Sequence, residues 1–152
     1  MTATNGTICI DGRVDASGLD GTKRNGYGGG GSGGTIFFEA KRFFGSETGE
    51  LLVTGGDTKP FQNGSTVLSS GSGAGGRIAV WSGEPWSQGL KPSRIKASTE
   101  PIVGKERFMS YRGSYSAAPG EILGSVQGYS GEAGTVRFCH VDREGGFSLI
   151  LR

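Results

Sequence analysis

The sequence predicts an all-β repeat protein, a solenoid in which short strands stack in successive coils. The main observation is a recurring phrase, Gly-(Thr/Arg)-(Ile/Val)-x-(Ile/Phe/Val), at residues 6–10, 34–38, 76–80 and 134–138. Each copy begins a two-residue hydrophobic alternation directly after a turn, which is the pattern of a short half-buried strand. Recurrence of one such phrase is typical of a repeat architecture.

A second phrase, with its own inward-facing pair of residues, lies between copies of the first. Its copies are at 12–18, 49–56 and 93–98. Gly34 and Gly76 are 42 positions apart, a spacing that suits two coils of roughly 20 residues each. The interval 82–124 is longer and holds four of the five prolines, which predicts one long loop excursion from the stack.

The alternation also predicts which side chains form the core. Equivalent positions of successive coils face one interior, so these residues should lie in aligned inward rows, with Phe37 and Arg137 facing outward. The predicted core residues are Ile8, Ile10, Val14, Ile36, Phe38, Leu51, Val53, Ile78, Val80, Ile95, Val136 and Phe138.

Glycine is the compositional outlier, at 31 of 152 residues, whereas about 7% is ordinary usage. Disorder is one interpretation of so much glycine and serine. Against it stand the 34% hydrophobic residues and their regular alternation. We therefore predict one ordered domain over 1–152, and we expect several glycines of 28–34 and 71–76 to have positive φ or to pack against neighbouring backbone.

Charge and hydropathy argue against several partners. The formal net charge is +2, the basic residues are scattered, and no segment reaches 18 consecutive apolar residues, so we expect neither nucleic-acid binding nor a membrane span.

The first residues lack the features of a signal peptide, and we interpret Met1 as an added start on an excised domain. Cys9 and Cys139 occupy the same outward position of the phrase near opposite ends of the chain, which predicts free thiols.

The glycine-rich phrases at 28–36, 73–80 and 131–138 resemble the parallel β-helix repeats of large secreted or surface-exposed bacterial proteins, such as the passenger regions of autotransporter-like adhesins. The resemblance implies a single-stranded right-handed parallel β-helix, export to the cell surface or beyond, and a longer parent protein. It implies partners at the ends of the stack, either flanking repeats or a second copy. It supplies no functional residues.

Glycine density and the single histidine are weak indications of chemistry. Residues 28–33 satisfy G-x-G-x-x-G, but a phosphate loop precedes a helix and here a β-alternation follows. His140 is the only histidine, without a cysteine or carboxylate cluster nearby in sequence, so a structural role is favoured over a zinc site or a catalytic triad. We predict no metal and no cofactor.

Catalysis on polysaccharides needs two carboxyl groups held close together in a cleft. Asp15 with Glu50, or Asp11 with Glu39, are the candidate pairs. Asp57 follows two glycines as in a calcium-binding nonapeptide, but that pattern does not repeat. Solvated outward positions are the favoured interpretation, and we predict no catalytic residue.

Aromatic residues in the excursion are the better candidates for binding, because exposed rings stack on sugars or anchor protein interfaces. The alternative is that Trp81 and Trp86 merely cover the side of the stack. The predicted ligand-binding residues are Trp81, Trp86, Tyr111, Tyr115, Arg94 and Arg112.

These observations favour a non-enzymatic extracellular module, a stalk or adhesin segment with carbohydrate or a surface protein as its partner. Two alternatives stay open: a fragment of a polysaccharide lyase or glycoside hydrolase, and a structural spacer without a ligand.

Overall fold

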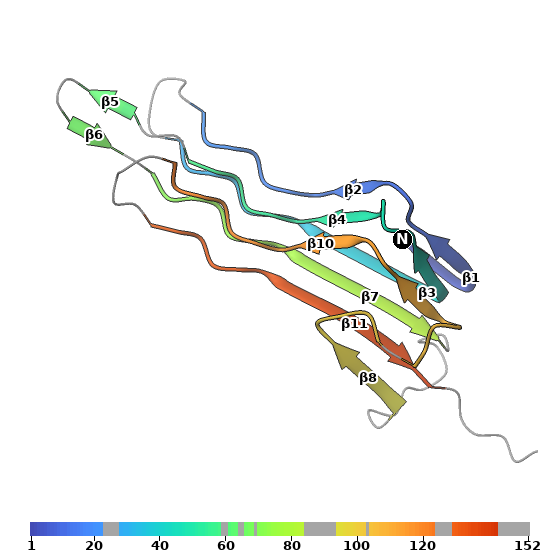
Figure 1. Cartoon of the computed structure of the whole chain (residues 1–152). Helices are drawn as coiled ribbons and strands as arrows, with labels where there is room; N and C mark the ends of the chain where they lie inside the picture. The colour runs from blue at the N-terminus through green and yellow to red at the C-terminus, as the bar shows by residue number, and fades with distance from the viewer. Residues whose placement is uncertain are drawn as a thin grey trace, which may run out of the picture.

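The computed structural model describes residues 1–22, 28–58, 61–63, 66–68, 70–83, 94–102, 104–123 and 129–142. Strands β1 (Thr2–Cys9), β3 (Thr35–Gly45), β7 (Arg77–Gly83), β11 (Thr135–Val141) and β8 (Ile95–Ser98) form a sheet in that order, with β9 (Met109–Tyr111) beside β3. A second sheet has the order β10 (Ser114–Ser116), β4 (Glu50–Leu52), β2 (Arg13–Asp15). Strands β5 (Phe61–Asn63) and β6 (Thr66–Leu68) form a hairpin (Figure 1).

The predicted fold class, an all-β single-stranded right-handed parallel β-helix with one long loop excursion, is wrong. The described residues include almost no helix, but their strands form two separate sheets and a hairpin, and they pair both parallel and antiparallel. The described part of 82–124 is not a single loop either, since it contributes β8, β9 and β10 to the two sheets.

The first copy of the phrase shows why the repeat was misinterpreted. The copies at 34–38, 76–80 and 134–138 do align in register, with Ile36 beside Ile78 and Ile78 beside Val136. The copy at 6–10 aligns instead with the far end of β3, where Ile8 lies beside Phe43. Copies of one phrase therefore occupy two different positions in the sheet. The spacing between copies does not give the number of residues in a repeating coil.

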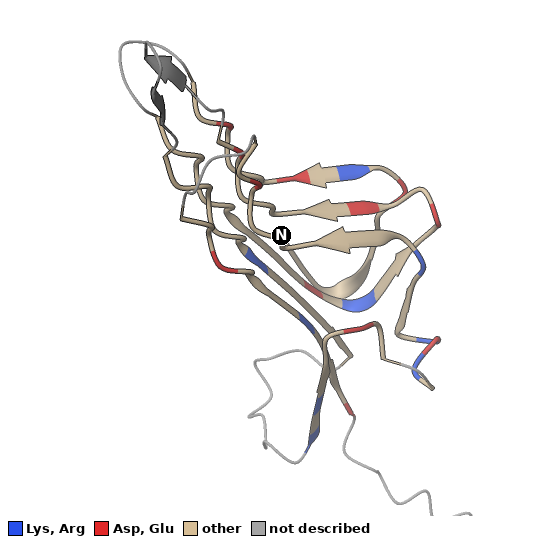
Figure 2. Cartoon of the chain, turned by 60° about the vertical axis from the view of Figure 1, so that its left-hand side comes forward, with Lys and Arg blue, Asp and Glu red and all other residues tan. Residues whose placement is uncertain are grey.

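The hydrophobic core is formed by side chains from strands of both sheets, whose backbones are seen in Figure 2. Nine of the predicted core residues are buried there, and Val14 and Val136 are partly buried against it. Phe37 and Arg137 are exposed, so the predicted phase of β3 and β11 is confirmed. Ile95 is only partly buried and lies outside this cluster. The core also contains side chains that the phrase did not predict, namely Ala40, Phe43, Met109, Tyr111 and Ala117.

The glycine-rich segments form a second, hydrogen-bonded half of the molecule, here called the glycine bundle. One row of segments leads into β3, β7 and β11, and it consists of 28–34, 71–76 and 129–134. The other row follows β2, β4 and β10, and it consists of 16–21, 53–58 and 117–123. In Figure 1 these segments continue the two sheets toward the hairpin β5–β6.

Hydrogen bonds in the bundle follow a period of three residues. In segment 28–34, two N–H groups three residues apart donate to segment 71–76, and two others, again three apart, donate to segment 16–21. These donors are Gly30 and Gly33 for the first pair and Gly31 and Gly34 for the second. Three residues per turn without internal hydrogen bonds is the geometry of a polyproline II helix. Each segment can thus bond to neighbours both within its row and across to the other row.

Close approach of neighbouring segments, both within a row and between the two rows, explains why glycine is needed. A Cβ atom on Gly73 would lie 1.9 Å from the carbonyl oxygen of Gly31, and one on Gly30 would lie 1.9 Å from that of Gly56. The expectation of backbone packing in both glycine runs is therefore confirmed. Among the described glycines, those with positive φ are Gly83 and Gly104, which lie outside the runs.

Candidate binding site

The outer face of the larger sheet carries an aromatic and charged patch, here called the aromatic face. Residues of β3 and β7 whose side chains alternate away from the core line an open depression of about 570 Å³. These residues are Thr35, Phe37, Glu39, Arg77, Ala79 and Trp81. Arg137 of β11 lies beside Ala79 in register and is also exposed.

The aromatic face combines apolar surface with polar groups. Phe37 is 44% exposed, an unusual position for a large hydrophobic side chain, and Trp81 is partly buried on the neighbouring strand. Glu39 lies directly beside Trp81 in register, and Thr35 lies beside Arg77. Rings flanked by a carboxylate and a guanidinium can bind a ligand that has both apolar faces and hydroxyl groups.

The structure divides the predicted ligand-binding residues between several places. Trp81 belongs to the aromatic face, whereas Tyr111 and Tyr115 pack against Phe138 on the core side of the same sheet, with ring centroids 6.3 and 5.1 Å away. Arg94 donates through Nε to the carbonyl oxygen of Asp142 at 2.8 Å. Arg112 is exposed in the connection between β9 and β10, and Trp86 lies outside the described residues.

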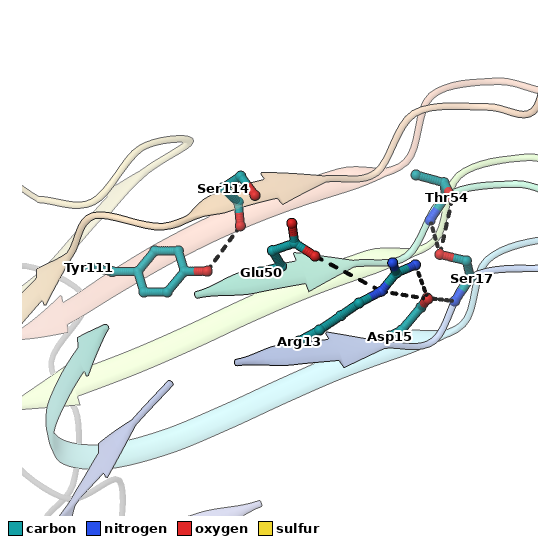
Figure 3. A network of polar contacts seen from close by, with 7 residues as sticks. All are labelled: Arg13, Asp15, Ser17, Glu50, Thr54, Tyr111 and Ser114. Atoms are coloured by element: carbon teal, nitrogen blue, oxygen red, sulfur yellow. Dashed lines mark hydrogen bonds and ion pairs between the residues drawn. The ribbon is translucent and has the colours of Figure 1, made fainter. Parts of the chain in front are cut away.

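Tyr111 is part of the structure's interior rather than of an open surface. Its side chain is 5% exposed, and its hydroxyl donates to the carbonyl oxygen of Ser114 at 2.9 Å (Figure 3). Burial, with a smaller effect of the nearby Glu50 carboxylate, raises the pKa of Tyr111 to about 12. Its hydroxyl is therefore satisfied internally and stays protonated at neutral pH.

Asp15 and Glu50, one of the two carboxylate pairs considered for catalysis, are held by neighbours on the second sheet (Figure 3). Arg13 contacts Asp15 at 2.6 Å and Glu50 at 4.0 Å. Hydrogen bonds from Ser17, assisted by Arg13, lower the pKa of Asp15 to about 2. A carboxylate that stays ionised to such low pH cannot serve as a general acid near neutrality.

A second cluster surrounds His140, at the end of the strands that form the aromatic face. The His140 side chain is 2% exposed. Its Nδ1 lies 3.0 Å from the hydroxyl oxygen of Ser82, and its Nε2 lies 3.4 Å from Oδ1 of Asp142. Because an ionised carboxylate only accepts hydrogen bonds, Nε2 carries the proton and Nδ1 accepts from Ser82 in the neutral ring.

This group of a serine, a histidine and an aspartate is not recognisable in the sequence, because Ser82 and His140 are 58 positions apart. Only their pairing in register on β7 and β11 brings them together. The group lacks the exposure that a nucleophile needs, since Ser82 is 2% exposed and does not line the adjoining cavity. The prediction that His140 has a structural role agrees with this burial.

Folding stability should depend on His140 as the pH falls. Burial lowers the pKa of His140 below its ordinary value of 6.5, with smaller opposing effects from Asp142 and supporting ones from Lys105 and Lys96. Below pH 6.5 the unfolded chain gains a proton at this position that the folded chain resists, so stability is full above pH 6.5 and decreases as pH falls below it.

Urea unfolding between pH 7.5 and 5 should show this decrease, and His140→Gln should remove it from that interval. Asp11 and Asp15 titrate in a lower range, because hydrogen bonds lower their pKa values from 3.8. If the free energy of unfolding of His140→Gln still decreased between pH 7.5 and 5 as it does in the original chain, His140 would not be the group responsible.

Both cysteines are free thiols, as predicted. Cys9 is exposed, but Cys139 is 5% exposed although it alternates to the outer side of β11. Burial raises the pKa of the Cys139 thiol, which disfavours the reactive thiolate.

Within the described residues, no three His, Cys, Asp or Glu side chains gather closely enough to hold a metal ion. Nor does the described part of the chain contain a helix with the length and apolar character of a membrane span. No protein-family model, curated protein or solved structure matches the chain.

Proposed function

We propose that this chain is a non-enzymatic binding module of an extracellular or cell-surface protein, and that it binds carbohydrate through the aromatic face. The observation that carries the proposal is the diagonal placement of an exposed Phe37 and Trp81 on adjacent strands of a sheet. Sugars present apolar C–H faces to aromatic rings and hydroxyl groups to carboxylates and guanidinium groups.

Sheet geometry supports an extended ligand. Phe37 lies beside Ala79, and Trp81 is two residues further along β7. The two ring-bearing positions are therefore roughly 8 Å apart, given the spacing between strands and the rise along them. One oligosaccharide chain can contact both rings at that separation, with Glu39 and Arg77 beside it. Ala79 lies between Arg77 and Trp81 along β7, and its small side chain leaves room for a ligand beside Phe37.

A glycan-array screen of the purified chain tests this proposal, with Trp81→Ala and Phe37→Ala measured on every glycan that binds. We expect each substitution to weaken binding about tenfold, from lost stacking and lost apolar contact. Tyr129→Ala is the matched control, because Tyr129 is an 89% exposed aromatic residue outside the aromatic face.

Unchanged glycan affinity in both variants would contradict the proposed face. Turnover of a bound polysaccharide would favour the enzyme alternative, and the absence of any bound glycan would favour the structural spacer.

A further inference from the structure

A cavity of about 440 Å³ opens beside the buried histidine, and its lining is strongly basic. It is here called the basic cavity. It is formed by the end of β3, the turn before β9, and the ends of β7 and β11. Its lining residues are Lys41, Arg42, Gly83, Arg107, Phe108, His140, Val141 and Asp142.

Three cations of the basic cavity have no partner of opposite charge among the described residues. Lys41, Arg42 and Arg107 take part in none of the ion pairs that the described part of the chain forms. Arg42 and Arg107 are exposed at the rim, and Lys41 is partly buried. Three cations gathered on one concavity repel each other, and an anion between them removes that repulsion.

The single carboxylate of the lining does not neutralise these cations. Asp142 accepts a hydrogen bond from Lys105 and lies 3.7 Å from Nζ of Lys96. These contacts lower its pKa, the hydrogen bond from Lys105 most of all. Glu106, in the same turn as Arg107, accepts a hydrogen bond from the Gly104 N–H and does not line the cavity. Among the described lining residues, the one carboxylate is thus already bound by Lys105 and Lys96, and the cations Lys41, Arg42 and Arg107 remain.

The basic cavity adjoins the aromatic face along the same strands. Gly83 of the cavity is two residues beyond Trp81 on β7, and Lys41 is two residues beyond Glu39 on β3. Side chains two positions apart on a strand share a face and lie about 6.6 Å apart. Lys41 therefore shares the face of Glu39, and a ligand that lies over the rings can extend an acidic substituent toward Lys41 at the cavity.

We infer that the basic cavity binds the acidic group of an anionic saccharide, a carboxylate or a sulfate ester. Arg42 and Arg107 donate charge-assisted hydrogen bonds to its oxygens, and Lys41 contributes a third positive charge. Phe108, whose ring centroid is 5.3 Å from that of His140, forms an apolar wall. This inference rests on the proposed carbohydrate function, and it specifies the class of sugar.

His140 provides a direct probe, because it is the only histidine in the chain and lines the cavity. Its imidazole NMR signal can be followed in the tag-free protein at pH 7.5 while glucuronate or sulfate is added, with chloride as the ionic-strength control. We expect a saturable shift with at least one of the two anions. The tighter-binding one identifies the acidic group.

Arg42→Gln and Arg107→Gln should each weaken binding of the anion about tenfold, because each removes a hydrogen bond to a charged group. Arg13→Gln is the matched control, since it removes the same charge on β2 of the other sheet. No shift beyond that of chloride, or equal affinity in all three variants, would overturn the inference.

Failure of the basic cavity and failure of the proposed function can be told apart. Trp81→Ala should leave the affinity for free glucuronate and sulfate unchanged while it weakens a bound oligosaccharide. If oligosaccharides bind through the aromatic face but neither free anion moves the His140 signal, only the basic cavity is wrong.

Discussion

Gly73→Ala should unfold the chain or destabilise it by about 3 kcal/mol or more. The new Cβ would lie 1.9 Å from the Gly31 carbonyl oxygen and 2.9 Å from the Gly56 nitrogen, so the clash is with backbone on two neighbouring segments. Hydrogen bonds hold both segments in place, because the Gly31 carbonyl oxygen accepts from the Gly56 N–H at 2.8 Å and the Gly56 carbonyl oxygen accepts from the Gly73 N–H at 2.9 Å.

Urea or thermal unfolding measures this loss directly. Gly12→Ala is the control, because a Cβ there meets no atom within 4 Å and its φ lies outside the positive range. Its stability should remain within about 0.5 kcal/mol of the original chain. If Gly73→Ala and Gly12→Ala had equal stability, close packing of neighbouring segments would not be what requires glycine in the bundle.

Phe138→Ala should cost about 3–5 kcal/mol of unfolding free energy. The ring is fully buried, it lies beside Val80 in register, and it contacts Tyr111 and Tyr115. Truncation leaves a cavity between the two sheets that the surrounding side chains can only partly fill. Val80, Tyr111 and Tyr115 each lose their contacts with the ring.

Phe37→Ala is the comparison for this prediction. Phe37 is of the same residue type, on β3 of the same sheet, but it points outward and is 44% exposed. Its truncation should change stability far less than Phe138→Ala, as measured by denaturant unfolding of both variants side by side. Similar losses for the two would mean that Phe37 is also part of a packed core.

Local alternation was sufficient to predict which side of each strand faces the core. The alternation placed Ile36, Phe38, Ile78 and Val80 inward and Phe37 outward, because the side-chain period of a strand is two whatever sheet contains it. Topology did not follow from the same information. Which strand lies beside which depends on pairings such as Ile8 with Phe43, and a short recurring phrase does not distinguish between two possible partners.

A glycine-rich stretch before a strand usually indicates a turn, because single glycines most often serve there. In the bundle the glycines instead occur in extended segments, and the requirement at Gly30 or Gly73 is set by a backbone from elsewhere in the chain. The sequence shows the density of glycine but not the neighbour that demands it. A period of three in donor positions became visible only with the partners in place.

Much the same reason limited the prediction of binding residues. Trp81 was identified from its type and its outward phase, and Tyr111 was included because it shares the same sequence interval. The strand β9 carries Tyr111 into the core instead. The basic cavity assembles Lys41, Arg107 and His140 from positions nearly 100 residues apart, so no local pattern marks it.

The glycine bundle also implies that the two halves of this molecule respond to temperature in opposite ways. Apolar burial between the sheets gives a large positive heat-capacity change on unfolding, and its stabilising effect weakens as the temperature falls. Exposure of peptide groups contributes to the heat capacity with the opposite sign, and glycine loses more backbone entropy on ordering than any other residue. Cooling therefore favours the hydrogen-bonded half relative to the hydrophobic half, and warming penalises its ordered glycines most. In the cold, the hydrogen bonds of the glycine bundle therefore continue to stabilise the chain while the contribution of apolar burial decreases.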